Sequence, residues 1–300
     1  MLKNTFFALI LIFMMNGCSE SEQQTQTEAK TSKEVYTVNY PLYYFTQRMA
    51  PKSIKVIFPV PNDVDPAFWQ PKTEEILGFA QADLIILNGA DYAKWRSTAS
   101  LPTSKLVNTS KAFEKDLIHI ESADHTHGPG GEHSHAGTAF TTWLDMQQAI
   151  KQAEAIKNAL ILMEPEEKEQ IEQSYLQLKQ ELEELDKGFR NAVKDHQRPI
   201  IASHPIYQYF ARAYGLDLKA LLWEPEMKID KKAQADIKAL LAVHPAKVMI
   251  WEGKPTEENL DYIRSLGLQN MVIEPCMNRP DNGDFISLMQ MNSQNIKEVL

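Results

Sequence analysis

Residues 168–196 read KEQIEQSYLQLKQELEELDKGFRNAVKDH. Apolar side chains recur in this stretch at steps of three and four residues, while glutamate, lysine and glutamine fill most other positions. The apolar stripe consists of Ile171, Tyr175, Leu178, Leu182, Leu185, Phe189 and Val193. This spacing predicts one continuous helix, about 43 Å long at 1.5 Å per residue. We expect it to join two lobes by packing against both, in preference to pairing in a coiled coil.

Short apolar runs alternate with helical patterns on both sides of this helix. Residues 82–88 (ADLIILN) precede it, and residues 199–202 (PIIA) and 248–251 (VMIW) follow it. Continuous apolar strands separated by helices indicate parallel sheets covered on both faces. The predicted fold class is therefore α/β, with two lobes that each contain a mostly parallel sheet flanked by helices. We assign residues 34–167 to the N-terminal lobe, 168–196 to the linking helix and 197–300 to the C-terminal lobe.

The first 17 residues have the features of an export signal. Lys3 provides a basic start, and the apolar run from Phe6 to Met15 is too short to span a bilayer. The run leads to Met15-Asn16-Gly17-Cys18, which resembles a bacterial lipoprotein processing site with Cys18 as the lipidated residue. Secretion with a cleavage near Gly17 is the alternative. Residues 18–33 contain almost no apolar surface and predict a disordered tether, so we expect a membrane-anchored lipoprotein, periplasmic or at the cell surface.

Charge and cysteine content narrow the possible partners. Without residues 1–17, which carry Lys3 alone, 30 basic residues face 40 acidic ones, a net charge of −10. This balance argues against a nucleic-acid partner and favours attraction of cations. The two cysteines are Cys18 and Cys276, so acylation of Cys18 leaves no intramolecular disulfide. We expect Cys276 to be a buried, lone thiol.

Residues 125–135 read HTHGPGGEHSH and hold four of the chain's eight histidines. His125 and His127 precede a Gly-Pro-Gly-Gly bend, and His133 and His135 follow it. Imidazole is a good ligand for zinc and other late first-row divalent ions. We therefore predict a flexible metal-binding loop over residues 124–136, with a solvated surface loop as the alternative.

Several further motifs occur in a characteristic order along the chain. They are Tyr40-Pro41-Leu42-Tyr43, Val64-Asp65-Pro66, Asn88-Gly89-Ala90, the His-rich loop, Trp143-Leu144-Asp145 and Ser203-His204-Pro205. Together with the long helix, they resemble the zinc/manganese-binding solute receptors of bacterial metal ABC importers, of the zinc-receptor type with a His-rich loop. The resemblance covers about residues 34–300. It implies a metal ion in the cleft between two lobes and delivery of that ion to an ABC permease in the cytoplasmic membrane.

The resemblance also implies four ligands in the cleft, of which this sequence keeps two. The histidine expected directly after Asp65-Pro66 is Ala67, and the histidine expected two residues before Trp143 is Thr141. The third expected ligand is present as His204, and the fourth, an acid after the last strand, matches Glu274. Two ligands do not form a tight zinc site, which typically needs four, or three plus water.

Three completions of the site are open. In the one we favour, the His-rich loop folds over the cleft, and imidazoles from His125, His127, His133 or His135 join His204 and Glu274. In the second, the acids Glu224 and Glu252 join, because each stands between a tryptophan and a proline or glycine at a predicted strand end. In the third, the cleft binds a chelated metal by means of Trp69, Trp223 and Trp251.

The sequence thus predicts an extracytoplasmic, monomeric receptor that captures Zn²⁺ and delivers it to an ABC importer. Mn²⁺ is the less favoured ion, because manganese sites lean towards carboxylate ligands. The alternative is a metal-buffering or adhesion-type surface lipoprotein that feeds no permease. An enzyme is disfavoured, because the sequence shows no Ser-His, Cys-His or His-Glu-x-x-His arrangement that would support catalysis.

Overall fold

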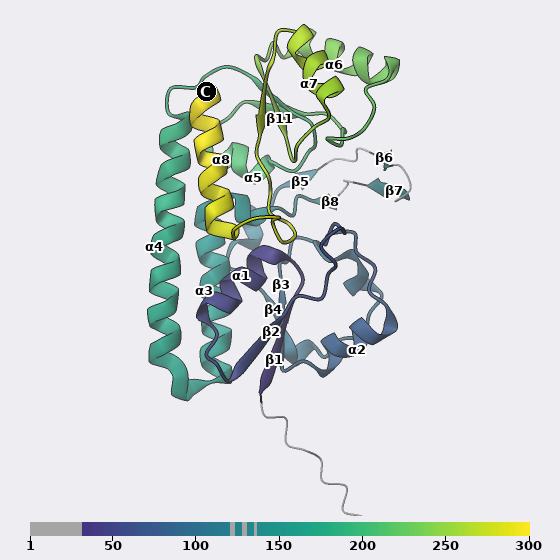
Figure 1. Ribbon diagram of the computed structural model, residues 1–300. Coiled ribbons are helices and arrows are strands. Elements are labelled where there is room, and N and C mark those ends of the chain that lie inside the picture. The colour runs from purple at the N-terminus through teal and green to yellow at the C-terminus, as the bar shows by residue number, and fades with distance from the viewer. Residues whose placement is uncertain (1–31, 121–123, 128–130, 135–136) are drawn as a thin grey trace, which may run out of the picture. The chain divides into compact units, whose positions relative to one another are not determined.

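Two four-stranded parallel sheets form the framework of the computed structural model (Figure 1), which describes residues 32–120, 124–127, 131–134 and 137–300, with side chains outside 121–136. The first sheet has the order β2-β1-β3-β4 and the second β10-β9-β11-β12, so both lobes share one strand order. The strands of the first sheet are β1 (Lys33–Thr37), β2 (Ile54–Ile57), β3 (Leu84–Leu87) and β4 (Leu106–Asn108). Those of the second are β9 (Ile200–Ala202), β10 (Leu218–Ala220), β11 (Val248–Trp251) and β12 (Gln269–Val272).

Eight α-helices cover and connect these sheets. They are α1 (Tyr40–Met49), α2 (Thr73–Gln81), α3 (Met146–Met163), α4 (Lys168–Val193), α5 (Gln208–Tyr214), α6 (Lys231–Val243), α7 (Glu257–Ser265) and α8 (Phe285–Val299) among the described residues. Several begin at a side chain that accepts hydrogen bonds from the first-turn N–H groups, including Asn39, Asp145, Asp230 and Asp284. Such caps fix where the helices begin relative to the strands before them.

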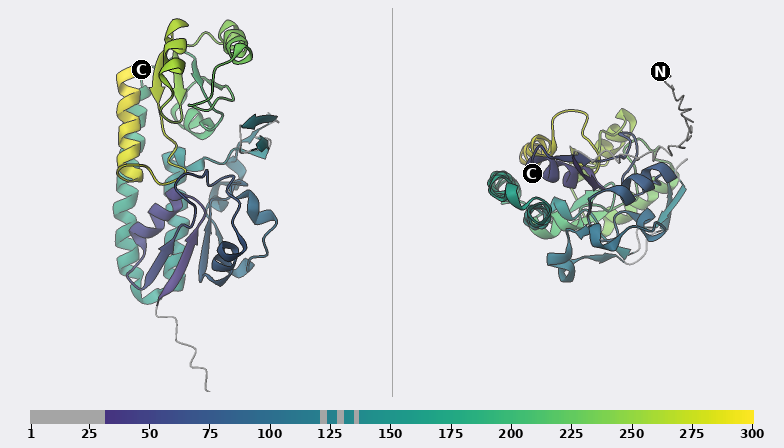
Figure 2. Two further views of the ribbon diagram at one scale, coloured as in Figure 1. Left: turned by 45° about the vertical axis from the view of Figure 1, so that its right-hand side comes forward. Right: turned by 90° about the horizontal axis from the view of Figure 1, so that it is seen from below.

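Helix α4 is the predicted backbone helix. All seven positions of its apolar stripe are buried, and the helix packs against α1, α3 and α8. Figures 1 and 2 show α4 running past both sheets, with α3 beside its first half and α8 beside its second. One continuous apolar core extends from the first sheet across α4 to one face of the second sheet. The α/β fold of two lobes joined by one long helix is therefore confirmed.

An ion pair ties α1 to α4. Arg48 donates two hydrogen bonds of 2.7 Å to the Glu181 carboxylate, one from each terminal nitrogen. Arg48 also bonds the Tyr44 hydroxyl, which lies 3.2 Å from Asp284 at the start of α8. This bidentate geometry holds three helices together at their contact.

The His-rich segment differs from the prediction of a loop without strands. Strand β6 (Asp124–His127) pairs antiparallel with β7 (Gly131–Ser134), and His125 lies opposite His133 in this register. The hairpin follows β5 (His119–Ile120) and precedes β8 (Gly137–Thr138), which also pair antiparallel (Figure 1). The backbone of this segment thus forms a short ladder, and the prediction was wrong on that point. Lys33, placed by the sequence in the tether, pairs with Ile54 in the first sheet.

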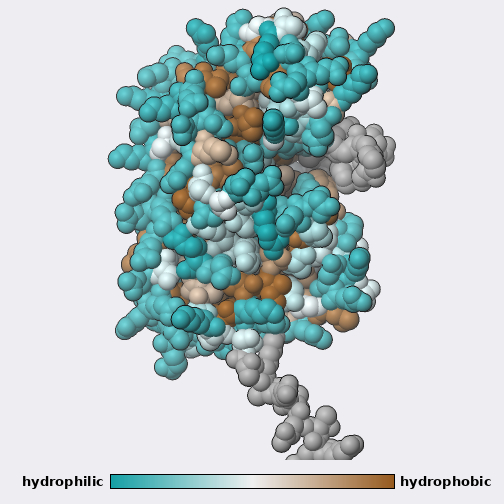
Figure 3. Space-filling model, viewed as in Figure 1, coloured by the Kyte–Doolittle hydropathy of each residue, from teal (hydrophilic) through white to brown (hydrophobic). Residues whose placement is uncertain are grey.

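Residues 1–31, which include the predicted signal, most of the tether and Cys18, lie outside the described residues. Within the described part of the chain, no helix combines the length and apolar character needed to cross a membrane. Polar side chains cover most of the face in Figure 3. Large apolar side chains that are exposed include Leu162, Leu176 and Val243, which is normal for a protein surface when such residues are scattered.

Candidate metal centre

Each strand of the second sheet is followed by a residue that can bind a metal. His204 follows β9, Glu224 follows β10, Glu252 follows β11 directly and Glu274 follows β12. Because all four strands are parallel, their carboxyl ends meet at one edge of the sheet. The chain order reverses between β9 and β11, and ligands of open α/β sheets bind outside the carboxyl ends at such a point.

Backbone hydrogen bonds beyond the strands bring these residues closer. The Trp223 N–H donates to the Ser203 carbonyl at 2.8 Å, which places Glu224 beside His204. The Ile273 N–H donates to the Trp251 carbonyl at 2.9 Å, and in the same way places Glu274 near Glu252.

Three of the four side chains converge. His204 Nδ1 lies 3.5 Å from Glu224 Oε1 and 3.9 Å from Glu252 Oε1, and the three possible ligand atoms all lie within 4.8 Å of one another. In the described part of the chain, this is the one group of three or more His, Cys, Asp or Glu side chains with such spacing. The His204 side chain is 6% exposed, that of Glu252 12% and that of Glu224 38%. The structure therefore brings His204 together with the two acids of the second predicted completion, without Glu274.

The electrostatics of this group favour a cation. The pKa of Glu252 is raised well above its usual value, first by burial and then by the charge of Glu224, its hydrogen bond to Glu224 and the charge of Asp65. The pKa of Asp65 is raised to about 6 by the crowding of its carboxyl in the cleft and by Glu224, while the Ala67 N–H lowers it. Asp65 remains accessible to water, so the crowding reflects nearby cleft walls rather than full enclosure. A bound divalent cation would offset the repulsion among these carboxylates.

Glu274 lies beside this group but is not part of it. It lines a pocket of about 230 Å³ together with Glu252 and Asp65. Partial burial and the charge of Asp281 raise its pKa. The backbone of Glu274 is fixed by Asn292 of α8, whose side chain accepts from the Glu274 N–H at 3.0 Å and donates to its carbonyl at 2.8 Å. Its role as a ligand remains a prediction.

The two positions without a ligand side chain are closed by packing. Ala67 and Thr141 are buried, and the Thr141 hydroxyl donates to the Ile206 carbonyl. Asp65, two residues before Ala67, is the N-terminal-lobe acid that the sequence reading missed as a site residue. Its position in the loop that follows β2 (Ile54–Ile57), directly before a proline, was the available signal.

The remaining predicted site residues divide into two groups. His135 lies outside the described residues, as do the side chains of His125, His127 and His133, so completion by the His-rich segment stays a prediction. Trp69, Trp223 and Trp251 are buried in the cores and offer little ring surface to a chelate, which removes the basis for the third completion. Cys276 is buried, as expected, with its thiol pKa raised by burial.

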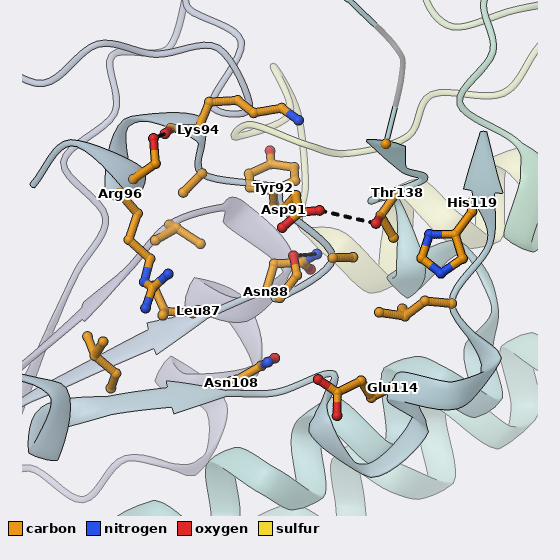
Figure 4. A pocket seen from close by; sticks show the side chains of 18 residues that line it. Leu87, Asn88, Asp91, Tyr92, Lys94, Arg96, Asn108, Glu114, His119 and Thr138 are labelled. Atoms are coloured by element: carbon orange, nitrogen blue, oxygen red, sulfur yellow. Dashed lines mark hydrogen bonds between the residues drawn. The ribbon is translucent and has the colours of Figure 1, made fainter. Parts of the chain in front are cut away.

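A second, larger pocket of about 700 Å³ lies in the N-terminal lobe, next to the β5–β8 pair (Figure 4). Asp91, Glu114 and His119 line it, and Asp91 Oδ2 accepts a 3.1 Å hydrogen bond from the Thr138 hydroxyl. Figure 4 shows these side chains arriving from separate elements. Among the described residues they form no group with the spacing of metal ligands.

Comparison with known proteins agrees with this fold. The family model described as zinc-uptake complex component A, periplasmic (ZnuA), matches residues 35–299. The chain belongs to this family. Its members are components of an uptake complex, which argues against an enzyme, and the resemblance drawn from the sequence motifs is confirmed.

Individual relatives of this ZnuA-family chain have low sequence identity but long coverage. It is 25% identical over 310 residues to the high-affinity zinc uptake system protein ZnuA of Bacillus subtilis (strain 168), covering 98% of this chain and 96% of that one. It is 26% identical over 238 residues to the manganese ABC transporter substrate-binding lipoprotein PsaA of Streptococcus pneumoniae, covering 77% and 74%. The crystal structure of the metal-dependent lipoprotein YcdH from Bacillus subtilis matches with a TM-score of 0.76 and 23% identity, over 90% of this chain and 100% of that one. This structural match shows the shared fold.

Proposed function

We propose that this ZnuA-family chain captures Zn²⁺ at the carboxyl edge of the second sheet and delivers it to an ABC permease. The observation that supports this most is the convergence of His204, Glu224 and Glu252 in an acid-rich cleft. Relatives named for zinc and for manganese uptake support the same class of ion, with Mn²⁺ second.

Two of the three spacings in this group are close to those of a zinc site, and the third is within 4.8 Å. Donor atoms about 2.1 Å from a tetrahedral zinc ion lie about 3.4 Å apart. Glu224 Oε1 is already at 3.5 Å from His204 Nδ1, and Glu252 Oε1 at 3.9 Å needs a movement of about half an ångström. Three protein ligands leave a fourth position for water, Glu274, an imidazole of the His-rich segment or another nearby donor.

The location of the protein belongs to the same proposal. Lipoprotein relatives of metal importers support an extracytoplasmic chain anchored through Cys18. A tethered, soluble receptor body could then load zinc and dock on a permease in the cytoplasmic membrane. Protonation of the carboxylates or competition by permease ligands would release the ion on docking.

The test is calorimetric titration of the metal-free protein with zinc chloride. We expect one cleft site in the wild type, strong loss of affinity in His204→Ala and Glu252→Gln, and a smaller effect in Glu274→Gln. Glu183→Gln, an exposed change on α4, is the matched control. If the wild type binds no zinc after equilibrium dialysis at neutral pH, or if the cleft variants bind as the control does, the proposal is wrong.

A further inference from the structure

The N-terminal lobe brings a carboxylate of its own to the cleft. Asp65 follows β2 and lines the same pocket of about 230 Å³ as Glu252 and Glu274, which belong to the other lobe. An ion held by His204, Glu224 and Glu252 alone would be bound by one lobe only. Among the described residues, Asp65 is the acid of the N-terminal lobe that lines this pocket with Glu252, and its charge acts on Glu252.

The two carboxylate oxygens of Asp65 differ in their hydrogen bonding to the described residues. Oδ1 accepts a 2.8 Å hydrogen bond from the Ala67 N–H, which orients the carboxylate. In the described part of the chain, Oδ2 has no hydrogen-bond partner. An oriented carboxylate with one such oxygen, exposed to water beside other acids, is suited to bind a cation.

The loop that carries Asp65 is held by two residues of the C-terminal lobe, both in the connection between β12 and α8. Asn278 donates from Nδ2 to the carbonyls of Pro61 at 2.6 Å and Val64 at 2.8 Å. Arg279 donates to the Phe58 carbonyl at 2.6 Å, and its guanidinium lies 4.5 Å from the centre of the Phe58 ring. We call Asn278 and Arg279 the clamp. The clamp fixes the backbone at Phe58, Pro61 and Val64, the last of which directly precedes Asp65.

The segment between the clamp and β12 is itself held at several points. Asn292 bonds both backbone groups of Glu274, and the Tyr40 N–H donates to the Met277 carbonyl at 3.0 Å. The Trp143 indole donates to the Pro275 carbonyl at 2.7 Å. Residues 274–279 thus form a short, anchored link from the carboxyl edge of the second sheet to the Asp65 loop.

We propose that Asp65 is the N-terminal lobe's ligand for the ion and that the clamp is what positions it. This inference rests on the proposed function, because it concerns the same ion site. Asn278 and Arg279 act through Asp65 and contact no ion themselves.

The first test compares two isosteric changes on one loop. Asp65→Asn retains the acceptor for Ala67 but removes the charge, and Asp63→Asn removes the same charge from an exposed residue two positions away. In zinc titrations by calorimetry, Asp65→Asn should weaken affinity by about 10- to 100-fold, and Asp63→Asn by less than about twofold. Equal affinities in the two variants would overturn the assignment of Asp65.

The second test is a double-mutant cycle for the clamp. Arg279→Met should weaken zinc binding about fivefold in the wild type and have no further effect when Asp65 is already Asn. A merely structural role would give the same loss in both backgrounds and would overturn the positioning claim. Circular-dichroism melts check folding, and Asn278→Ala serves as the second clamp variant if Arg279→Met does not fold.

The outcomes separate this inference from the proposed function. Absence of zinc binding in the wild type contradicts the proposed function. Tight binding in the wild type that is lost in His204→Ala but unchanged in Asp65→Asn contradicts only the present inference.

Discussion

Replacing Glu252 with glutamine should make the metal-free protein more stable while it weakens zinc binding. Glu252 is nearly buried, and the charges of Glu224 and Asp65 act on it. Without a metal, the Glu252 carboxyl is either ionised and repelled by these neighbouring charges, or it binds a proton. Glutamine has the same shape and needs neither, so the change removes an unfavourable interaction from the folded state.

The size of the effect follows from two independent bounds. Two charges 4.8 Å apart, the outer limit for this group, repel by about 3.5 kcal/mol at an effective dielectric constant of about 20. Holding a proton at pH 7 on a group with a reference pKa of 4.5 costs about 3.4 kcal/mol. Because Glu224 is partly exposed and therefore screened, we expect a gain of about 1–3 kcal/mol. For a chain of this size, that gain raises the melting temperature by about 2–10 °C.

The assay is thermal unfolding of wild type and Glu252→Gln with a chelator and with zinc. Zinc at about 1,000 times the wild-type dissociation constant adds about 4.1 kcal/mol to the wild type, which exceeds the advantage expected for the weakly binding variant, so the order of melting temperatures should reverse. The advantage of the variant should also depend on pH. A carboxyl whose pKa is raised on folding destabilises the protein as pH rises above its unfolded value, so the difference should fall below about 1 kcal/mol at pH 5.

Glu183→Gln on the exposed face of α4 is the control, and we expect a change within about 0.5 kcal/mol. If metal-free Glu252→Gln melts at or below the wild-type temperature at pH 7.5, the reasoning about crowded carboxylates is refuted. A difference that does not shrink at pH 5 would show that the gain has another origin.

Three further predictions concern the ion site and the helix contacts. Because the pKa of Asp65 is raised to about 6, protons should compete with zinc, and affinity measured by dye competition should fall about twofold between pH 7 and pH 6 and about tenfold between pH 7 and pH 5; a flat profile would contradict this. Deletion of residues 124–136 should leave one zinc ion per chain in equilibrium dialysis, and complete loss of binding would show that the cleft needs the His-rich segment. Arg48→Met should lower the free energy of unfolding in urea by about 1 kcal/mol through loss of its pair with Glu181, without altering zinc affinity, whereas Lys232→Met in an exposed pair should have no measurable effect.

Much of the fold could be predicted from local pattern. The apolar stripe of α4 identified the helix that joins the lobes, because a long amphipathic repeat has few other interpretations. The run Val248–Trp251 matched β11 at both ends. Strands β4 (LVN) and β10 (LKA) were missed, since neither has the uninterrupted apolar run that marks β9 (IIA).

Helices α3, α6 and α8 were also missed, although the sequence held a signal for each. All three begin at an aspartate, Asp145, Asp230 and Asp284, whose side chain accepts hydrogen bonds from the first-turn N–H groups. A capping aspartate is informative only when the turn around it forms, so this signal is weak without the rest of the fold.

By itself, the sequence determined the α/β class, the backbone helix and an acidic chain with His204 and Glu274 at strand ends. It could not determine that Glu224 and Glu252 would converge on His204, or that Asp65 would line a pocket with Glu252. That choice depends on the order β10-β9-β11-β12, which places the ends of β10 and β11 on either side of β9. Strand order arises from the packing of helices and sheets over the whole chain, so only the tertiary structure brings together residues that lie far apart in sequence.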